Sequence, residues 1–447
     1  MLNKVLVANR GEIAVRIIRA CRELGIKTVA VYSEADKDAL HTRLADEAVC
    51  IGPAPSKKSY LNIKNILEAA CLTHADSIHP GFGFLSENAD FAKMCEESNI
   101  KFIGPSYKVI DLMGNKSNAK ALMKSAKVPV VTGSEGSIKG YKEACEIADK
   151  VGYPIMIKAA AGGGGKGIRL VTKKEELEDS YNIVKQEAKV SFNDDEIYIE
   201  KFIENPRHVE IQVLADEHGN AVYLGERDCT VQRRNQKVIE ESPSTVVDDK
   251  LRKKMGEAAI NAVKAAKYAN AGTIEFLVDK NKNFYFMEMN TRIQVEHPVT
   301  EMVTGIDIVK EQLRIASGEK LRFSQSDIKP KGHSIECRIN AECPEKGFMP
   351  SPGTIKELLF PGGNGVRIDT SVYTGYTIPP VYDSMIAKII VHGENREEAI
   401  NKMKRALDEC VISGVDTNID FLYKILDNEN FVKGNYDTSF IKKENLA

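Results

Sequence analysis

The chain contains no tryptophan, and it has no apolar run near the ~20 residues that a helix needs to cross a bilayer. The first absence weakens any expectation of an aromatic platform for single-stranded nucleic acid. A net charge of −2 gives no global basic field. We therefore expect neither nucleic acid nor a membrane as partner. Residues 1–9 predict a strand rather than a signal peptide, because their apolar run is short and no cleavage site follows.

Cysteine is too sparse and too scattered to predict a disulfide framework. The nine cysteines are an odd number without any C-x-x-C pair, which favours reduced thiols in the cytoplasm. The closest two, Cys337 and Cys343, have no second pair to complete a tetrahedral zinc site. A length of 447 residues with 43% hydrophobic content predicts two or three ordinary packed domains.

The segment 284–298 alternates in a way that predicts a strand with one polar face. Every second residue from Glu288 to Glu296 is polar, and the residues between are mostly apolar. Side chains alternate across a strand, so an extended backbone would bring these polar groups together. They are Glu288, Asn290, Arg292, Gln294 and Glu296.

A second strand is predicted at 273–279, joined to the first by a four-residue turn. In that register Glu275 faces Glu288, and Leu277 faces Phe286. A register slipped by one residue would remove the opposition of the two acids.

Opposed acids in such a hairpin indicate a cation between them. Two carboxylates ~5 Å apart repel by roughly 3 kcal/mol at an effective dielectric of ~20. Together with the amide oxygen of Asn290, Glu275 and Glu288 suit Mg²⁺, with phosphate oxygens and water completing the shell. The alternative is a hairpin whose two glutamates point into water.

The first hundred residues alternate between strands and helices, which predicts a parallel sheet of the doubly wound type. The turn after the first strand is not G-x-G-x-x-G, so dinucleotide binding is a weak hypothesis. A glycine-rich turn at 78–88 lies beyond a strand's carboxyl end, where ligands collect in such sheets. The predicted strands are 4–8, 28–32, 77–79 and 102–103, and the predicted helices are 12–23, 63–70 and 87–95.

A second unit from 115 to 204 carries a glycine loop at 161–167 between two strands. The spacing is not that of a Walker loop, and a strand rather than a helix follows. Repeated glycines supply amide donors to phosphates, so we interpret the loop as a flap over a nucleotide; a flexible surface hairpin is the alternative. Lys158 favours the flap, because a lysine in an apolar strand needs an anionic partner such as a triphosphate. The unit's other predicted elements are a helix after 116, strands at 154–159, 169–172 and 196–201, and a helix at 175–188.

The last third has a candidate boundary at 324–332, followed by a mostly β region with a helix at 396–409. Within 334–340, Glu336, Arg338 and Asn340 alternate and predict a second polar face aimed at a site. The cationic run at 232–237 is by itself expected to be a solvated run of charges, as such runs usually are.

Several long strings together resemble the biotin carboxylase family, the ATP-grasp subunits of acetyl-CoA carboxylase and related enzymes. The resemblance spans essentially the full length. The strings are KVLVANRGEIA (4–14), HPGFGFLSEN (79–88), AGGGGKG (161–167), RHVEIQ (207–212), EMNTRIQVEHP (288–298) and YDSM (382–385).

The resemblance implies an α/β fold, α+β overall, in three domains. These are a Rossmann-like N-terminal domain at 1–114, an ATP-grasp domain at 115–328 and a mixed β C-terminal domain at 329–447. A mobile glycine-rich lid would cover about 131–204.

The resemblance also places roles on residues. The implied ATP contacts are Lys116, Lys158, Gly164, Gly165, His208, Gln232, Asn235 and Leu277, with an adenine-binding hinge at Glu200, Lys201, Phe202 and Ile203. The implied ligands of Mg²⁺ or Mn²⁺ are Glu275, Glu288 and Asn290. Lys237, Arg292, Gln294 and Val295 would bind bicarbonate, Glu296 would deprotonate it, and Arg338 would stabilise the biotin anion, with Phe82 near biotin.

Two positions depart from the family's pattern. Asn235 stands where the family often has histidine, and Phe82 stands where it often has tyrosine. We expect altered nucleotide contacts from the first, and packing without a hydroxyl from the second.

The activity implied is ATP- and bicarbonate-dependent carboxylation of biotin through carboxyphosphate, the first half-reaction of acetyl-CoA carboxylase. A propionyl-CoA or pyruvate carboxylase subunit is an alternative, and another bicarbonate-using ATP-grasp ligase is a further one. A non-catalytic nucleotide sensor or scaffold is the hypothesis from another class.

The expected partners follow from the same resemblance. No methionine-flanked lysine lies on a tight hairpin, since Met403-Lys404 lies in a helical pattern, so biotin is expected on a separate carrier protein. Carboxyltransferase subunits and a second copy of the chain are further expected partners. Arg16 and the residues from Phe360 onward are candidate dimer-interface positions.

Overall fold

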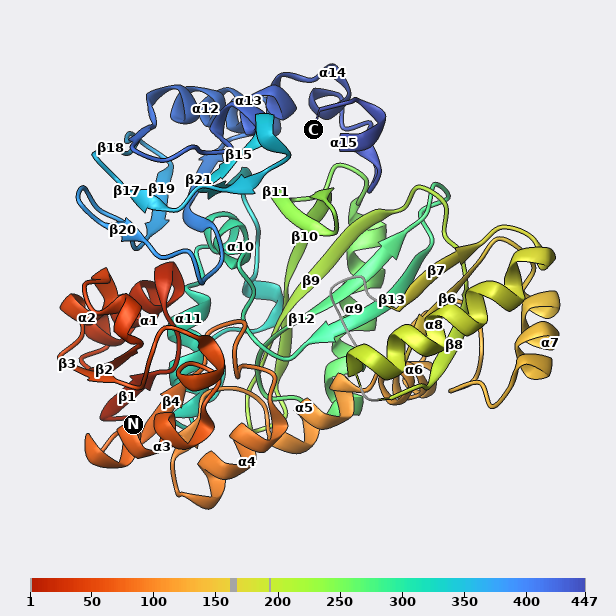
Figure 1. Ribbon diagram of the computed structural model, residues 1–447, viewed down its shortest axis with the longest axis horizontal. Coiled ribbons are helices and arrows are strands. Elements are labelled where there is room, and N and C mark those ends of the chain that lie inside the picture. Colours follow the sequence, from red (N-terminus) through yellow and green to blue (C-terminus); the bar gives the residue numbers. More distant parts are fainter. Residues whose placement is uncertain (1, 161–166, 193, 447) are drawn as a thin grey trace.

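The computed structural model describes residues 2–160, 167–192 and 194–446, so the predicted contacts Gly164 and Gly165 lie outside the described residues. In Figure 1 the N-terminal part lies at the lower left, the C-terminal part at the top, and strands β6 to β8 lie at the right of a central sheet.

The N-terminal part is built on a parallel sheet in the order β3-β2-β1-β4-β5, which confirms the doubly wound prediction. Sequence reasoning missed α2, β3 and α5, and β3 is short and largely exposed. The strands are β1 (Lys4–Val7), β2 (Lys27–Tyr32), β3 (Glu47–Cys50), β4 (Ser77–His79) and β5 (Lys101–Phe102). The helices are α1 (Gly11–Glu23), α2 (Leu40–Leu44), α3 (Ile63–Leu72), α4 (Ala89–Glu97) and α5 (Tyr107–Gly114).

One eight-stranded sheet joins the central and C-terminal parts of the chain. Its order is β13-β12-β9-β10-β11-β14-β21-β19, and every neighbouring pair is antiparallel. Side chains from distant segments can therefore share one face of one sheet. The strands are β9 (Arg207–Ala215), β10 (Ala221–Arg233), β11 (Gln236–Ser242), β12 (Asn270–Val278), β13 (Phe284–Asn290), β14 (His333–Asn340), β19 (Val366–Thr370) and β21 (Met385–Gly393).

Helices cover this sheet and form its core. Helix α9 (Asp249–Ala266) packs on β9 and β10, burying Met255 and Val263 against Val209 and Ile211. Helix α12 packs on β21 and β14. The remaining helices of this region are α6 (Lys116–Ser125), α10 (His297–Thr304) and α11 (Ile308–Ala316).

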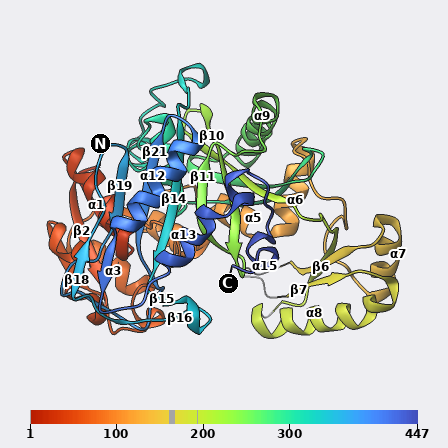
Figure 2. The same cartoon turned by 90° about the horizontal axis from the view of Figure 1, so that it is seen from above.

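The lid region forms a small separate layer. Its antiparallel sheet, in the order β7-β6-β8, buries Ile157 and Ile199 against Val184 of α8. Figure 2 shows this layer at the far end of the molecule from the N-terminal sheet. Its elements are β6 (Ile155–Ala159), β7 (Ile168–Val171), β8 (Ile197–Lys201), α7 (Tyr141–Val151) and α8 (Leu177–Phe192).

The C-terminal part contains the predicted late helix, α12 (Arg396–Glu409), with the predicted bounds. Three further helices were not predicted, although α13 buries Phe421 and Leu422 in the core. They are α13 (Ile419–Asp427), α14 (Glu429–Val432) and α15 (Phe440–Lys443). The short paired strands are β15 (Glu342–Cys343), β16 (Met349–Pro350), β17 (Gly353–Thr354), β18 (Glu357–Leu359), β20 (Thr377–Ile378) and β22 (Val411–Ser413).

Across the described residues, no helix combines the length and apolar character needed to cross a membrane. All nine cysteines lie in the described part of the chain, and all are free.

The prediction of one continuous strand from Phe284 to Glu296 was wrong. Strand β13 ends at Asn290, and residues 291–296 form a loop that leads into α10. Pro298 lies in the first turn of that helix, where its fixed backbone favours helix initiation. The polar alternation beyond Asn290 therefore belongs to a loop, and Glu296 is the residue that precedes the helix.

Candidate active site

A cavity of about 840 Å³ opens above the eight-stranded sheet and gathers most of the predicted site residues. Its size is that of an ordinary ligand pocket. The predicted residues that line it are Lys116, Lys158, His208, Gln232, Asn235, Lys237, Glu275, Leu277, Glu288, Asn290, Arg292, Gln294, Val295, Glu296 and Arg338.

Five described residues from the predicted set do not line this pocket. Glu200 lines a neighbouring cavity, and Lys201 donates to the backbone oxygens of Gly152 and Tyr153. Phe202 and Ile203 follow β8 directly. Phe82 packs in the N-terminal core, and its carbonyl oxygen accepts a hydrogen bond from Asn9.

The two acids of the hairpin face each other as predicted: Glu275 pairs with Glu288 across β12 and β13. Between Glu275 and the turn the register is shifted by one residue, because Phe286 pairs with Phe276 rather than with Leu277. Met287 is the extra residue of a β-bulge that restores the opposition of the two acids. The bulge explains why the regular register holds at Glu275 and beyond it, where Ile274 pairs with Met289, but fails on the turn side.

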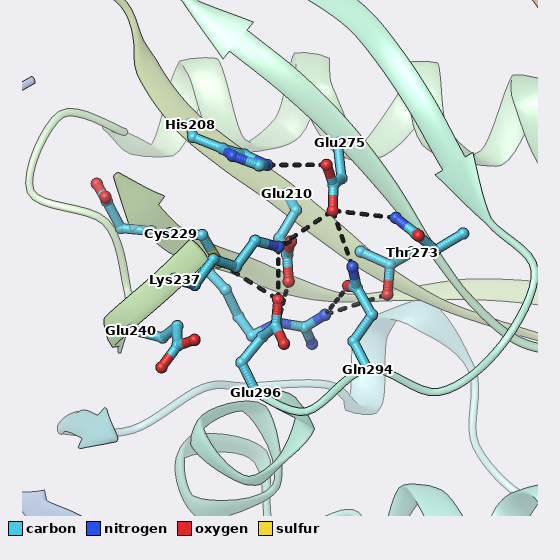
Figure 3. Close-up of polar contacts among 12 residues, drawn as sticks. His208, Glu210, Cys229, Lys237, Glu240, Thr273, Glu275, Gln294 and Glu296 are labelled. Atoms are coloured by element: carbon cyan, nitrogen blue, oxygen red, sulfur yellow. Dashed lines mark hydrogen bonds and ion pairs between the residues drawn. The ribbon is translucent and has the colours of Figure 1, made fainter. Parts of the chain in front are cut away.

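The carboxylate of Glu275 is surrounded by hydrogen-bond donors (Figure 3). Its Oε1 accepts hydrogen bonds from Asn290 at 3.0 Å, from Gln294 at 2.8 Å and from Lys237 at 3.1 Å. His208 Nε2 forms an ion pair with Oε2 at 3.0 Å. Burial opposes ionisation of Glu275, but Lys237 and His208 outweigh it and hold its pKa well below the usual range.

Glu288 is different. Among the described residues no hydrogen bond or ion pair satisfies its carboxylate. Burial, followed by repulsion from Glu275, raises the pKa of Glu288. A cation placed beside it would relieve both effects.

Lys237 is the central cation of the site. The cationic segment 232–237 is therefore not simply a solvated run of charges. Its Nζ donates to Glu296 at 2.6 Å, to Glu210 at 2.7 Å and to Glu275 at 3.1 Å. Burial disfavours its charge, yet the surrounding acids raise the pKa of Lys237 well above its usual range. The side chain of Cys229 lies against the same group, 3.8 Å from Glu296.

Arg338 lies between two acids. Its Nε donates to Glu240 at 2.6 Å, and one terminal nitrogen donates to Glu296 at 3.0 Å. Burial opposes ionisation of Glu296, but Lys237, Arg338 and a third arginine outweigh it and lower its pKa. Burial raises the pKa of Glu240 to about 6, partly offset by Arg338. Glu296 is therefore held as a carboxylate.

The second predicted polar face is only partly aimed at the pocket. Arg338 and Asn340 line it, but Glu336 is fully buried and does not. Neither carboxylate oxygen of Glu336 has a hydrogen bond among the described residues, and burial raises its pKa well above the usual range. Burial therefore disfavours the charged form of Glu336.

Arg292 is anchored by the N-terminal part. Its Nε donates to Glu87 at 2.8 Å, and a terminal nitrogen donates to the amide oxygen of Asn290 at 3.0 Å. Sequence reasoning gave Glu87 no role, although it lies in the string at 79–88.

Lys158 has an anionic partner, as predicted, but that partner belongs to the protein. Its Nζ donates to Glu200 at 2.7 Å, and Lys120 donates to the other oxygen of Glu200 at 3.0 Å. The carboxylate therefore lies where an anionic ligand of these two lysines would compete.

Sequence reasoning missed the buried arginine beneath the pocket. Arg227 has no exposed surface and donates to Glu210, Gln212 and Gln294. The polar alternation of His208, Glu210 and Gln212 in β9 could have indicated an inward face. No local pattern marks Arg227 itself.

The pocket combines opposed acids with a group of cations. The acids suit a hard metal ion, and Lys237, Arg292 and Arg338 suit an oxyanion. Such an arrangement can bring a phosphoryl donor and an oxyanion acceptor together in one pocket.

Three family models match almost the whole chain. "Biotin carboxylase, N-terminal domain" matches residues 1–110, "Carbamoyl-phosphate synthase L chain, ATP binding domain" matches 115–324, and "Biotin carboxylase C-terminal domain" matches 336–443.

Similar proteins carry related names. "Biotin carboxylase 1" of Bacillus subtilis (strain 168) is 60% identical over 443 residues, 99% of this chain and 98% of the relative. A pyruvate carboxylase subunit of Methanothermobacter thermautotrophicus is 56% identical and covers 99% of this chain and 90% of the relative.

A solved structure agrees closely in fold. The biotin carboxylase domain dimer of Hydrogenobacter thermophilus 2-oxoglutarate carboxylase, in complex with MgADP, ADP and bicarbonate, superposes with a TM-score of 0.96 at 52% identity. The match covers 100% of this chain and 98% of that one. The chain therefore belongs to the biotin carboxylase family of ATP-dependent ligases.

Proposed function

We propose that this chain carboxylates biotin on a separate carrier protein, using ATP and bicarbonate. The observation that carries the proposal is the single pocket in which Glu275 and Glu288 face each other beside Lys237, Arg292 and Arg338. A carboxylase of this kind needs its nucleotide site and its bicarbonate site close together, because carboxyphosphate and CO₂ are easily lost to water.

The described residues fit a hard metal ion at the acid pair. The donors are carboxylate and amide oxygens, and Glu288 has no competing partner among the described residues. An ion would compete with Arg292 for the Asn290 oxygen and with Lys237 and His208 for Glu275. Glu275, Glu288 and Asn290 would hold Mg²⁺ or Mn²⁺. The ion would neutralise the charge on the ATP phosphate oxygens.

The nucleotide would lie along the lid side of the pocket. We assign Lys116, Lys158, His208, Gln232, Asn235 and Leu277 to ATP contacts, with the backbone from Glu200 to Ile203 as the adenine hinge. The glycine loop, including Gly164 and Gly165, would complete the phosphate site. Lid closure would exclude water before the chemistry begins.

The cationic end would bind bicarbonate through Lys237, Arg292, Gln294 and the backbone of Val295. Glu296, held ionised, accepts the bicarbonate proton. A bicarbonate oxygen then forms a bond to the γ-phosphorus as the bond to ADP breaks, giving carboxyphosphate.

Carboxyphosphate then divides into CO₂ and phosphate. The phosphate takes the N1′ proton of biotin, and N1′ forms its new bond to CO₂. Arg338 stabilises the oxyanion that develops on the ureido oxygen, and Phe82 would pack near the ring.

We propose domain boundaries at 1–114, 115–328 and 329–447, with the lid at about 131–204. The edges of the matched family models support these boundaries. Because β14, β19 and β21 join the central sheet, the last two domains would share one core.

The partners proposed are a biotin carboxyl carrier protein, carboxyltransferase subunits and a second copy of this chain in the cytoplasm. Arg16 forms ion pairs within the chain with Glu301 and Asp307, which leaves it less available for a dimer contact. The segment around Phe360, where Leu359 is exposed, is the better candidate for the dimer interface. The final acceptor proposed is acetyl-CoA. The name of the Methanothermobacter relative keeps pyruvate as the second candidate.

The test is the ATPase rate titrated with bicarbonate, with and without free biotin. We expect hydrolysis that depends on bicarbonate and rises with biotin. Stimulation by ammonia or by a ribotide instead would contradict the proposal. Reconstitution with carrier and carboxyltransferase subunits, offered acetyl-CoA, propionyl-CoA or pyruvate, then decides the acceptor.

A further inference from the structure

One charged side chain near the pocket has no part in the chemistry above. Lys388 lies in the middle of β21 and has no exposed surface. A buried lysine is retained as a charge only where partners surround it. The acids around Lys388 outweigh its burial and raise its pKa, so the side chain is an ammonium group.

The contacts of Lys388 come from three other parts of the chain. Its Nζ donates to the carbonyl oxygen of Val295 at 2.8 Å. It forms an ion pair with Glu12 of α1 at 3.1 Å, and Asp369 of β19 lies 3.8 Å away. Of the three contacts, only the one to Val295 is a hydrogen bond, whereas Glu12 and Asp369 act on the ammonium group through their charge.

Val295 lies in a loop segment that has no strand pairing. Strand β13 ends at Asn290, so no strand ladder reaches Val295. The carbonyls on either side make long backbone hydrogen bonds, from His297 to Gln294 at 3.3 Å and from Val299 to Glu296 at 3.4 Å. The Gln294 carbonyl also contacts Nδ1 of His297 at 2.8 Å. Among the described residues, the Val295 carbonyl accepts a hydrogen bond from Lys388 alone.

The neighbours of Val295 both point into the pocket. Gln294 donates to Glu275, and Glu296 accepts from Lys237 and Arg338. A shift of the Val295 carbonyl would move both side chains together. A displacement of about 1 Å at such a position can lower a rate by about 10²-fold.

We propose that Lys388 is a positioning residue for the bicarbonate site. Glu12 and Asp369 hold its ammonium group, which fixes the Val295 carbonyl and thereby orients Gln294 and Glu296 toward bicarbonate. The proposal rests on the proposed function and adds a residue to it. The same contact makes α1, an N-terminal helix, part of the support of the catalytic loop.

Lys388→Met tests the proposal, because methionine keeps much of the stem and removes the donor. We expect the KM for bicarbonate to rise at least tenfold while the KM for ATP changes less than twofold. A general loss of folding would not separate these two constants. Lys402→Met is the matched control, since Lys402 donates to the carbonyl of His392 at the far end of β21, outside the pocket.

Glu12→Gln provides a second variant if Lys388→Met fails to fold. It removes the charge that holds the ammonium, and we expect a threefold or larger rise in the KM for bicarbonate alone. The proposal would be overturned if folded variants kept the wild-type KM for bicarbonate, or if the KM values for bicarbonate and ATP changed equally. Neither result would contradict the proposed function, provided that the wild-type chain shows bicarbonate-dependent ATPase. A wild-type chain without bicarbonate-dependent ATPase would overturn the proposed function and this inference together.

Discussion

The two ends of the pocket differ in how their charges are satisfied without ligand. At the inner end, formed by Lys237, Glu275, Glu296 and Arg338, every charged group has a close partner. At the outer end, formed by Lys116 and Glu288, neither group has a hydrogen bond or ion pair among the described residues. A satisfied network holds its geometry in advance, whereas unsatisfied charges mark where ligand atoms belong.

The largest effect should come from the outer end. Glu288→Gln removes a proposed metal ligand, and we expect ATP turnover to fall by about 10³-fold, which is about 4 kcal/mol. The bicarbonate-dependent ATPase assay measures it, with Glu257→Gln, an exposed position on α9, as control. Full ATP turnover in the variant would contradict the assignment of a metal site to Glu288.

The inner end should respond differently. Arg338→Ala should lower biotin carboxylation by about 10²-fold through loss of oxyanion stabilisation, while biotin-independent ATPase falls less than about tenfold. Both rates are measured on one preparation, with Arg338→Lys as the charge-preserving comparison. Equal binding defects for ATP in Arg338→Ala and Glu288→Gln would contradict the division into two ends.

Removing the charge of an acid should change the free energy of unfolding in opposite directions at the two ends. Glu275 has a lowered pKa, so its contribution is present above its ordinary value of 4.5 and is lost as pH falls. We expect Glu275→Gln to lower the free energy of unfolding at pH 7 by about 3 kcal/mol, because it leaves buried cations unpaired.

Glu288 has a raised pKa, so its charge opposes folding at neutral pH. Glu288→Gln should therefore raise the free energy of unfolding at pH 7. The Glu288 difference should shrink as the pH falls toward 4, whereas the Glu275 difference should begin to shrink only below about pH 4.5. Urea unfolding at pH 7, 5.5 and 4 measures them, and the opposite order of the two variants at pH 7 would refute this comparison.

The smallest effect is expected at the rim. Asn235 is exposed and lies in the turn between β10 and β11, so Asn235→His should change the KM for ATP by less than about threefold. Its free energy of unfolding should stay within about 0.5 kcal/mol of wild type. A tenfold change in the KM would mean that this departure alters the nucleotide site more than its exposure indicates.

Local periodicity predicted the parts of the site that lie on strands. The alternation in β12 and β13 predicted that Glu275 faces Glu288, but it could not predict the bulge at Met287, which adds one residue on one strand only. The same alternation was extended too far, because Pro298 starts a helix and the loop before it is shaped by contacts with distant residues.

Those distant contacts explain what the sequence could not predict. Arg338 meets Glu240 across β14 and β11, and Lys388 meets Val295 only after α1, β19 and β21 have assembled. No local pattern encodes such partners. Glu200 shows the same limit, since the sequence predicted an anion beside Lys158 and not which anion it would be.

The central claim is that bicarbonate at the inner end attacks ATP at the outer end. Bicarbonate labelled with ¹⁸O tests it most directly, by mass spectrometry of the phosphate released in one turnover. Attack by bicarbonate predicts one labelled oxygen in each phosphate. Phosphate without label would mean that water attacks instead, and it would contradict the coupling of the two ends.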